Sequence, residues 1–184
     1  MKRLAVYLTI FLALAACRQD GADLPPPVTM DEDALGYYCQ MNMTEHPGPK
    51  AQVHLEGTPY PLFFAQVRDA IAYQRMPEQD AVVVGIYVSD MSHADNWDTP
   101  GNDNWMRAPD AFYVVGSDAV GGMGAHELVP FSRQEDASAF AQEHGGKVVR
   151  LAEVADSDVL APENSDPVSD EDADYQQRLQ SLSQ

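Results

Sequence analysis

The sequence predicts an α+β protein made of two small ββαβ-like units with flexible termini on either side. The main observation is a weak internal repeat. Each half of the region 36–155 reads as a strand, a short segment with Pro and Phe, a helix and another strand. The helical patterns end at Pro77 and Gly145, and a β-branched segment follows each of them.

The first unit spans residues 36–90. A strand-like segment covers residues 51–56, and Val67 and Ile71 then share one face at helical spacing. The β-branched run 81–88 predicts a buried strand that closes the unit.

The second unit spans residues 110–155. A strand-like segment covers residues 110–115, the segment with Pro and Phe covers residues 127–131, a helix follows, and residues 147–151 predict the closing strand. Between the units, residues 91–109 are rich in Asp, Asn, Gly and Pro, which predicts a linker without regular structure.

The charge of the chain argues against a nucleic-acid-binding function. Eleven Lys and Arg residues against 29 Asp and Glu residues give the 184-residue chain a formal net charge of −18. A nucleic-acid-binding surface needs clustered cations, and no run of Lys or Arg occurs, so nucleic acid is not an expected partner.

Two cysteines cannot form a disulfide framework, and the body of the chain has no apolar run long enough to span a membrane.

The N-terminus, residues 1–16, reads as a lipoprotein signal peptide. Two basic residues precede an apolar stretch that is short for a membrane span. The stretch ends in Leu-Ala-Ala-Cys, which resembles the bacterial lipobox and makes Cys17 the expected lipid attachment site. An ordinary secretory signal is the alternative. The lipobox places the mature chain on the periplasmic side of a bacterial membrane, with the outer membrane favoured over the inner.

Both ends of the mature chain are polar. Residues 17–35 carry the lipid anchor and a proline-broken segment, which predicts a flexible spacer between the membrane and the domain. Residues 156–184 contain eight acidic residues and one basic residue, which predicts a disordered tail.

The candidate chemistry lies at Cys39, Met41 and Met43. Once Cys17 carries lipid, Cys39 is the only free thiol, which is unusual in an oxidising compartment. In an extended segment the three side chains point to one side, and a thiolate with two thioethers is a soft ligand set that selects Cu(I). The alternative is a half-buried strand whose Cys and Met residues pack in the core. Spacing alone does not decide between them, and the free thiol favours copper.

Further candidate ligands lie at His46, which follows the motif, and at Met123 and His126 in a glycine-rich loop. No phosphate-binding loop, Ser/His/Asp arrangement or HExxH motif occurs, so the sequence shows no catalytic machinery.

These segments resemble the NosL family of lipid-anchored copper proteins of the nitrous oxide reductase maturation system. The segments that carry the resemblance are the lipobox, YCQM (38–41), EHPGPK (45–50), GMG (122–124) and LVPF (128–131). The resemblance implies a pair of ββαβ units distantly similar to the organomercurial lyase fold. It also implies that Cys39 and Met41 are the main ligands of one Cu(I) ion. The family usually has Gly at the position of Gln40.

The function that the resemblance implies is delivery of Cu(I) to the copper centres of nitrous oxide reductase, without enzymatic turnover. The implied partners are the nitrous oxide reductase apoprotein and an ABC-type membrane complex of the same system. Two alternatives remain at this stage. One is an enzyme of the organomercurial-lyase type, but such a reaction uses more than one thiol and the mature chain would have only one. The other is a metal-free lipoprotein scaffold.

Overall fold

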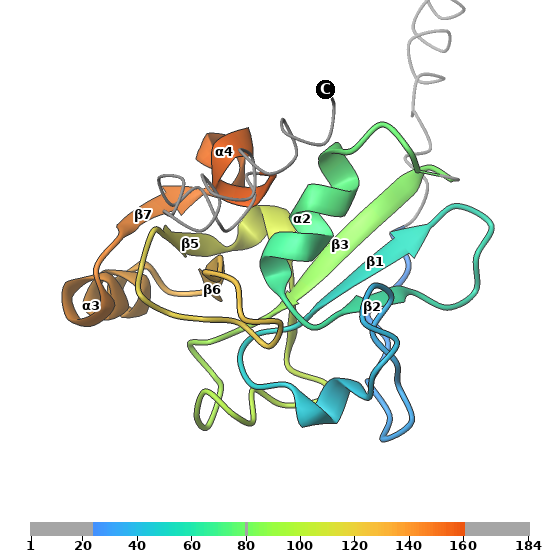
Figure 1. Cartoon of the computed structure of the whole chain (residues 1–184), viewed down its shortest axis with the longest axis horizontal. Helices are drawn as coiled ribbons and strands as arrows, with labels where there is room; N and C mark the ends of the chain where they lie inside the picture. The colour runs from blue at the N-terminus through green and yellow to red at the C-terminus, as the bar shows by residue number, and fades with distance from the viewer. Residues whose placement is uncertain (1–23, 80, 161–184) are drawn as a thin grey trace, which may run out of the picture.

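The computed structural model describes residues 24–79 and 81–160, and its chain forms two small sheets that lie side by side (Figure 1). The elements in chain order are η1 (Met43–Glu45), β1 (Ala51–Leu55), β2 (Leu62–Phe64), α2 (Val67–Arg75), β3 (Val83–Ser89), β4 (Trp105–Arg107), η2 (Ala108–Asp110), β5 (Phe112–Val115), β6 (Val129–Phe131), α3 (Gln134–His144), β7 (Lys147–Arg150), η3 (Leu151–Glu153) and α4 (Asp156–Val159).

The first unit is a four-stranded sheet in the order β2-β1-β3-β4, and every neighbouring pair is antiparallel. Helix α2 connects β2 to β3, so the expected ββαβ order is confirmed. Strand β4 is an addition: its Trp105 pairs with Ser89 of β3, within the segment expected to be a linker. The sequence did not predict this strand, because residues 91–109 have the composition of a loop. Three residues are also too few to show the apolar–polar alternation of a strand.

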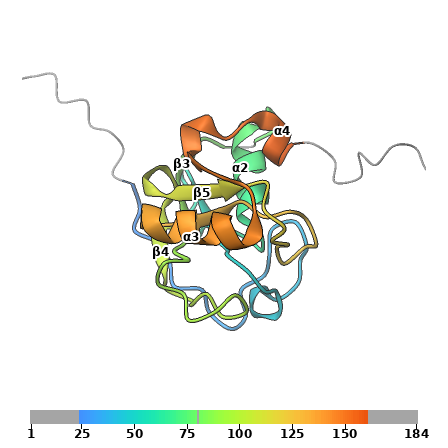
Figure 2. The ribbon, with the colours of Figure 1, turned by 90° about the vertical axis from the view of Figure 1, so that its left-hand side faces the viewer.

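The second unit repeats this plan with three strands in the order β6-β5-β7, again antiparallel. In both units the first strand of the ββαβ order, β1 or β5, lies in the centre. Helix α3 covers one face of the second sheet, as the side view shows (Figure 2). The predicted α+β class with two ββαβ units is therefore confirmed.

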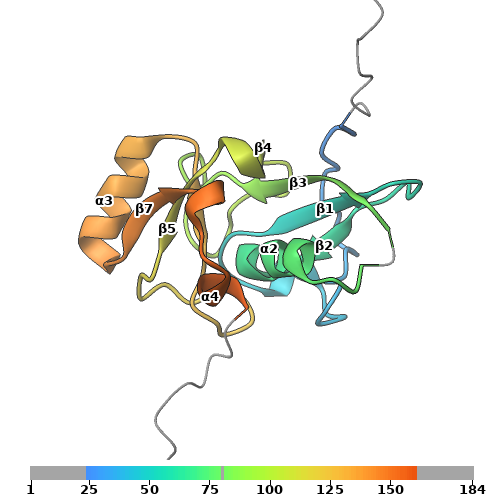
Figure 3. The ribbon, with the colours of Figure 1, turned by 90° about the horizontal axis from the view of Figure 1, so that it is seen from above.

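One apolar core joins the two units. Buried residues of β1, β3 and α2 form a continuous cluster with Tyr113 and Val115 of β5. A second cluster lies between β5, β6 and α3, and the view from above shows α3 at the far side of the molecule from α2 (Figure 3). The units consequently pack as one body, because β5 contributes side chains to both clusters.

The structure changes the expected boundaries of the flexible ends. Residues 24–35, expected to belong to the spacer, pack on the first sheet. Val28 exchanges two hydrogen bonds with the Gln52 side chain, and Met30 is buried. At the other end, residues 156–159 of the expected tail form α4, which packs against α2 and carries the ion pair Arg75–Asp156. Side-chain contacts from distant elements order both segments, and local composition does not register such contacts.

Several sequence predictions lie outside the described residues. These are the signal peptide 1–16, the lipid site Cys17 and the tail beyond residue 160. Within residues 24–79 and 81–160, no helix is both long and apolar enough to cross a bilayer.

Candidate metal centre

Residues 35–42 form a tight turn at the start of the first unit. Leu35 bridges to Asn42, and Gly36 bridges to Phe63 of β2. The extended geometry expected for residues 39–43 is therefore wrong, and Cys39, Met41 and Met43 do not share one side of a strand. Gln40 has a φ of 55°, in the left-handed region that glycine adopts most easily, and its side-chain Nε2 donates a hydrogen bond to the Tyr37 carbonyl.

The turn brings the Cys39 thiol next to the imidazole of His46. Cys39 Sγ and His46 Nε2 are 3.8 Å apart, and the thiol is half-buried. Sulfur and nitrogen ligands at about 2.3 and 2.0 Å from one ion, as in zinc sites, lie about 3.7 Å apart in trigonal geometry. The observed spacing therefore fits one metal ion between the two side chains.

The tautomer of His46 also suits metal binding. His46 Nδ1 lies 2.9 Å from the carbonyl oxygen of Gly122. A carbonyl oxygen only accepts hydrogen bonds, so Nδ1 must carry the hydrogen. In the neutral ring the lone pair is then on Nε2, the nitrogen that faces Cys39.

Gly36 lies directly against two sulfur atoms. A Cβ atom at this position would overlap Cys39 Sγ and would lie 3.4 Å from Met43 Sδ. Met43 is fully buried, and Cys39 packs on the small cluster to which Met43 belongs. The Met43 thioether thus approaches the thiol from the protein interior, at a place where only glycine leaves room.

Met41 lies on the solvent side of the turn. Its side chain is 44% exposed, and its carbonyl oxygen is 4.0 Å from Cys39 Sγ. Its thioether is on a flexible side chain with three rotatable bonds, and it is accessible from the solvent.

The backbone on which His46 sits is held by a buried lysine. Lys50 Nζ donates hydrogen bonds to the carbonyls of His46, Pro47 and Gly48 at 2.6, 3.1 and 2.7 Å. Burial lowers the pKa of Lys50 to about 8, although the nearby Glu127 carboxylate raises it. Lys50 therefore fixes the backbone that carries His46, a role that the sequence did not reveal.

The glycine-rich loop, residues 120–126, docks beside this site. Met123 N–H donates to the Gln66 side chain at 2.8 Å, and Val120 bridges to His126. The side chains of Met123 and His126 are both exposed. The turn and the loop thus bring Cys39 next to His46, and His46 next to the backbone of Gly122, while Met43 lies in the buried cluster on which Cys39 packs.

Below the loop, Glu127 ties the second unit to the first. Its carboxylate accepts hydrogen bonds from the N–H groups of Val67, Arg68 and Leu128. Burial raises the pKa of Glu127 to about 8, against the lowering effect of these N–H groups. The loop that presents Gly122 to His46 is thereby fixed to the first turn of α2.

Met30 is a sulfur-bearing residue that the sequence did not single out. It belongs to the same buried cluster as Met43, and both line a cavity of about 410 Å³ with His46. Its place in a proline-broken segment gave no periodic signal. Met30 is buried beside Met43 in this cluster and adds a second thioether near His46.

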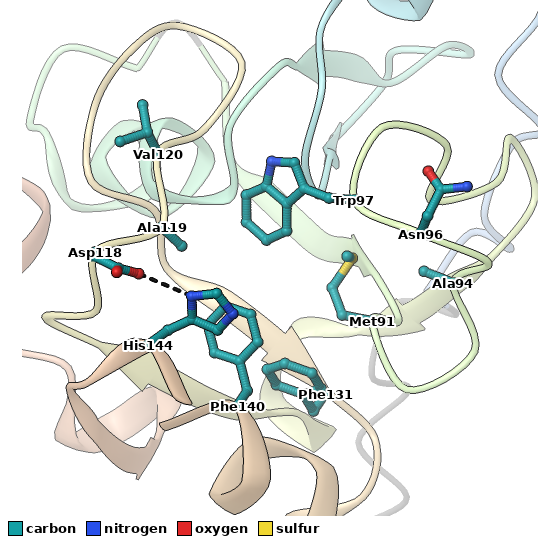
Figure 4. Close-up of a pocket in the computed structure, with 10 residues that line it drawn as sticks. All are labelled: Met91, Ala94, Asn96, Trp97, Asp118, Ala119, Val120, Phe131, Phe140 and His144. Atoms are coloured by element: carbon teal, nitrogen blue, oxygen red, sulfur yellow. Dashed lines mark hydrogen bonds and ion pairs between the residues drawn. The ribbon is translucent and has the colours of Figure 1, made fainter. Parts of the chain in front are cut away.

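Another cavity, of about 560 Å³, lies on the second unit between α3 and two loops (Figure 4). Trp97, Phe131 and Phe140 line it, and His144 in its wall is hydrogen-bonded to Asp118. None of the candidate ligands lines this cavity. Among the described residues, no group of three or more His, Cys, Asp or Glu side chains is placed so that it could hold a metal ion.

The chain resembles known proteins along nearly its whole length. Residues 27–159 match the NosL family. The chain is 52% identical over 183 residues to the copper-binding lipoprotein NosL of Achromobacter cycloclastes, which covers 98% of this chain and 94% of that protein. It is 32% identical over 152 residues to the copper-binding lipoprotein NosL of Stutzerimonas stutzeri, which covers 82% of this chain and 77% of that protein.

The fold also resembles a solved structure. The crystal structure of the copper chaperone NosL from Shewanella denitrificans aligns with a TM-score of 0.67 at 32% identity. The alignment covers 72% of this chain and 99% of that chain. The shared part thus corresponds in extent to the two units and not to the whole chain.

Proposed function

This chain belongs to the NosL family, and from that premise we propose that it is a lipid-anchored Cu(I)-binding protein. It delivers copper to the copper centres of nitrous oxide reductase during maturation of that enzyme. It acts by binding and transfer and performs no catalytic turnover. Its lipid is attached at Cys17 on the periplasmic side, with the outer membrane favoured.

The observation that carries this proposal is the pairing of Cys39 Sγ with His46 Nε2 at 3.8 Å. The hydrogen bond from His46 Nδ1 to Gly122 leaves the lone pair of Nε2 directed at the thiol. A thiolate, an imidazole and nearby thioethers form a soft ligand set, which suits Cu(I) and not the hard cations Mg²⁺ or Ca²⁺.

In this proposal the ligands have different roles. Cys39 and His46 hold one Cu(I) ion, and Met43 closes the site from the interior. Met41 binds from the solvent side, where a thioether can leave and return as copper is exchanged. Met123 and His126 remain candidate ligands from the glycine-rich loop.

The proposed partners are the nitrous oxide reductase apoprotein and an ABC-type membrane complex of the same system. The half-buried thiol and the exposed Met41 support transfer, because an incoming ligand can reach copper from the side of the turn. Ligand exchange of this kind moves Cu(I) without a change in its oxidation state.

The test is copper stoichiometry followed by transfer. Protein purified and loaded without oxygen should hold one Cu(I) ion per chain, and Cys39→Ser should hold none under the same chelator competition. Loaded wild-type protein should then restore activity to copper-free nitrous oxide reductase in the presence of membranes that contain the ABC-type complex. Stoichiometric binding without any restoration would retain the copper site and reject the delivery role.

A further inference from the structure

The described chain begins along one edge of the first unit. Residues 24–30 run beside β3 and β1: Tyr87 donates a hydrogen bond to the Pro25 carbonyl, and Leu24 lies against Gly85. At the other end of this segment, Met30 N–H is bonded to the Asn102 carbonyl. Followed back from Met30 to Leu24, the chain therefore runs towards the end of the sheet where β3 begins.

That end of the sheet carries exposed apolar side chains. Tyr60, in the turn between β1 and β2, is 73% exposed, and Val82, just before β3, is 63% exposed. The Glu56 N–H bonds the Val82 carbonyl, which joins the two connections. Met76, at the end of α2, is also exposed. Both connections lie at the same end of the molecule (Figures 1 and 3).

We propose that Tyr60, Met76 and Val82 form a membrane edge that lies in the headgroup region of the bilayer carrying the lipid of Cys17. The proposal rests on the lipid anchor that belongs to the proposed function. Six residues lie between Cys17 and Leu24, and an extended chain over these seven steps spans at most about 25 Å. The anchor thus keeps the bilayer surface within reach of this end of the sheet.

Charge decides the kind of lipid. The chain carries a net charge of −18, and Glu56 and Glu78 are exposed at the same end. Anionic headgroups would repel this edge, so contact depends on apolar and aromatic side chains in a zwitterionic surface. Tyrosine is favoured at such interfaces because its ring is apolar and its hydroxyl is polar.

The membrane edge would orient the copper site away from the bilayer. Gly36 of the turn bridges to Phe63, which pairs with Gln52 near the start of β1, whereas the membrane edge follows its end. The five residues of β1 span about 17 Å at the usual rise per residue. Cys39 would then open towards the aqueous side, where a soluble acceptor can approach it.

The experiment uses the lipidated full chain in phosphatidylcholine vesicles, with Cys39→Ser as the background so that only an introduced thiol is labelled. An environment-sensitive fluorophore is placed by Tyr60→Cys or by Val82→Cys. The matched control is Leu35→Cys, a residue 53% exposed on the turn at the opposite end. Nitroxide-bearing lipids should quench the label at positions 60 and 82 and leave it unquenched at position 35.

Flotation with the vesicles separates this proposal from the anchor itself. Protein that floats but shows no quenching at positions 60 and 82, or equal quenching at position 35, overturns the membrane edge and leaves the anchor intact. Protein that fails to float overturns both. Because positions 60 and 82 are exposed and independent, loss of folding in one variant leaves the other as the test.

Discussion

At the scale of single residues, the contacts of His46 specify which nitrogen can bind a metal. The Gly122 carbonyl requires a hydrogen on Nδ1, and Nε2 then faces the thiol of Cys39. Cys39 supplies negative charge as well as softness, whereas the methionines supply softness alone. The ligands should therefore differ in their effects on copper affinity.

We expect Cys39→Ser to lower the Cu(I) affinity by more than about a hundredfold, which exceeds the usual effect of residues outside the ligand set. His46→Gln and Met41→Leu should give smaller losses, and Met43→Leu the smallest, since leucine keeps the packing of this buried residue. Competition with a Cu(I) chelator measures each affinity. His144→Gln, in the wall of the cavity on the second unit, is the control. Unchanged affinity for Cys39→Ser would mean that the turn is a packing motif only.

The same chemistry predicts a dependence on pH. A thiol must lose its proton to bind copper, so the apparent Cu(I) affinity should fall as the pH is lowered from 8 to 5.5. A bound imidazole adds a second proton at the acidic end of this range. The slope of log affinity against pH should thus approach about one for a thiolate alone and rise towards about two with His46 bound. His46→Gln should remove the steeper part. A flat profile would exclude a thiolate ligand.

At the scale of elements, the turn 35–42 is the part of the fold that positions the sulfur atoms. Gly36→Ala removes no candidate ligand, but its new Cβ would overlap Cys39 Sγ. We expect a loss of Cu(I) affinity of about tenfold or more, because the added methyl group displaces the thiol. A loss of about 1.4 kcal/mol in binding free energy already lowers the affinity tenfold.

The control for this substitution is Gly57→Ala, in the turn after β1. Its φ is 73°, so alanine is strained there, but nothing lies within 4 Å of the added atom. Thermal unfolding should show that both variants lose stability, and the chelator titration should show lower copper affinity for Gly36→Ala alone. Equal affinities for the two variants would refute the close approach of Gly36 to the thiol.

Helix α2 and the glycine-rich loop meet at Glu127, and this contact predicts how stability varies with pH. Burial raises the pKa of Glu127 to about 8, well above its value of about 4.3 in an unfolded chain. Between about pH 4.3 and about pH 8, Glu127 therefore holds its proton more tightly in the folded protein than in the unfolded chain. The stability supplied by protonated Glu127 is therefore complete below about pH 4.3 and is lost as the pH rises to 8.

We expect the free energy of unfolding of the wild type to fall relative to that of Glu127→Gln between pH 5 and 8, by up to about 1.4 kcal/mol per pH unit. Urea unfolding at pH 5, 6.5 and 8 measures this difference. The comparison with the variant removes the contribution of the many other carboxylates. Parallel pH profiles would show that Glu127 is ionised throughout.

At the scale of the whole molecule, the two units share a core, and the proposed lipid site, Cys17, lies outside the described residues. No helix among residues 24–79 and 81–160 could cross a bilayer. In the proposed function, attachment to a membrane depends on a lipid at Cys17. The exposed membrane edge adds only a few apolar side chains, and these are too few to hold an acidic protein alone.

Cys17→Ala should accordingly release the protein from the membrane, either as uncleaved precursor or as soluble protein. Fractionation of cells with detection of the protein in each fraction tests this, and Cys39→Ala serves as the control for loss of a cysteine. A Cys17→Ala protein that stays firmly attached in its mature form would refute the lipobox interpretation.

The sequence by itself determined the two ββαβ units and identified Cys39. The units follow from local patterns: the spacing of Val67 and Ile71, the β-branched run 81–88 and the breaks at Pro77 and Gly145 are each contained in one element. Cys39 stood out because a lone thiol is chemically distinctive wherever the chain places it.

Only the tertiary structure decided which residues join Cys39. His46 was one of two candidate histidines, and its orientation beside Cys39 depends on the carbonyl of Gly122, 76 residues away. Gly36 matters because its backbone lies close to the thiol, and Lys50 because it donates hydrogen bonds to backbone carbonyls. Backbone groups are the same in every residue type, so neither contact produces a pattern in the sequence. Met30 and β4 are ordered by contacts with distant elements, so their local composition reads as loop.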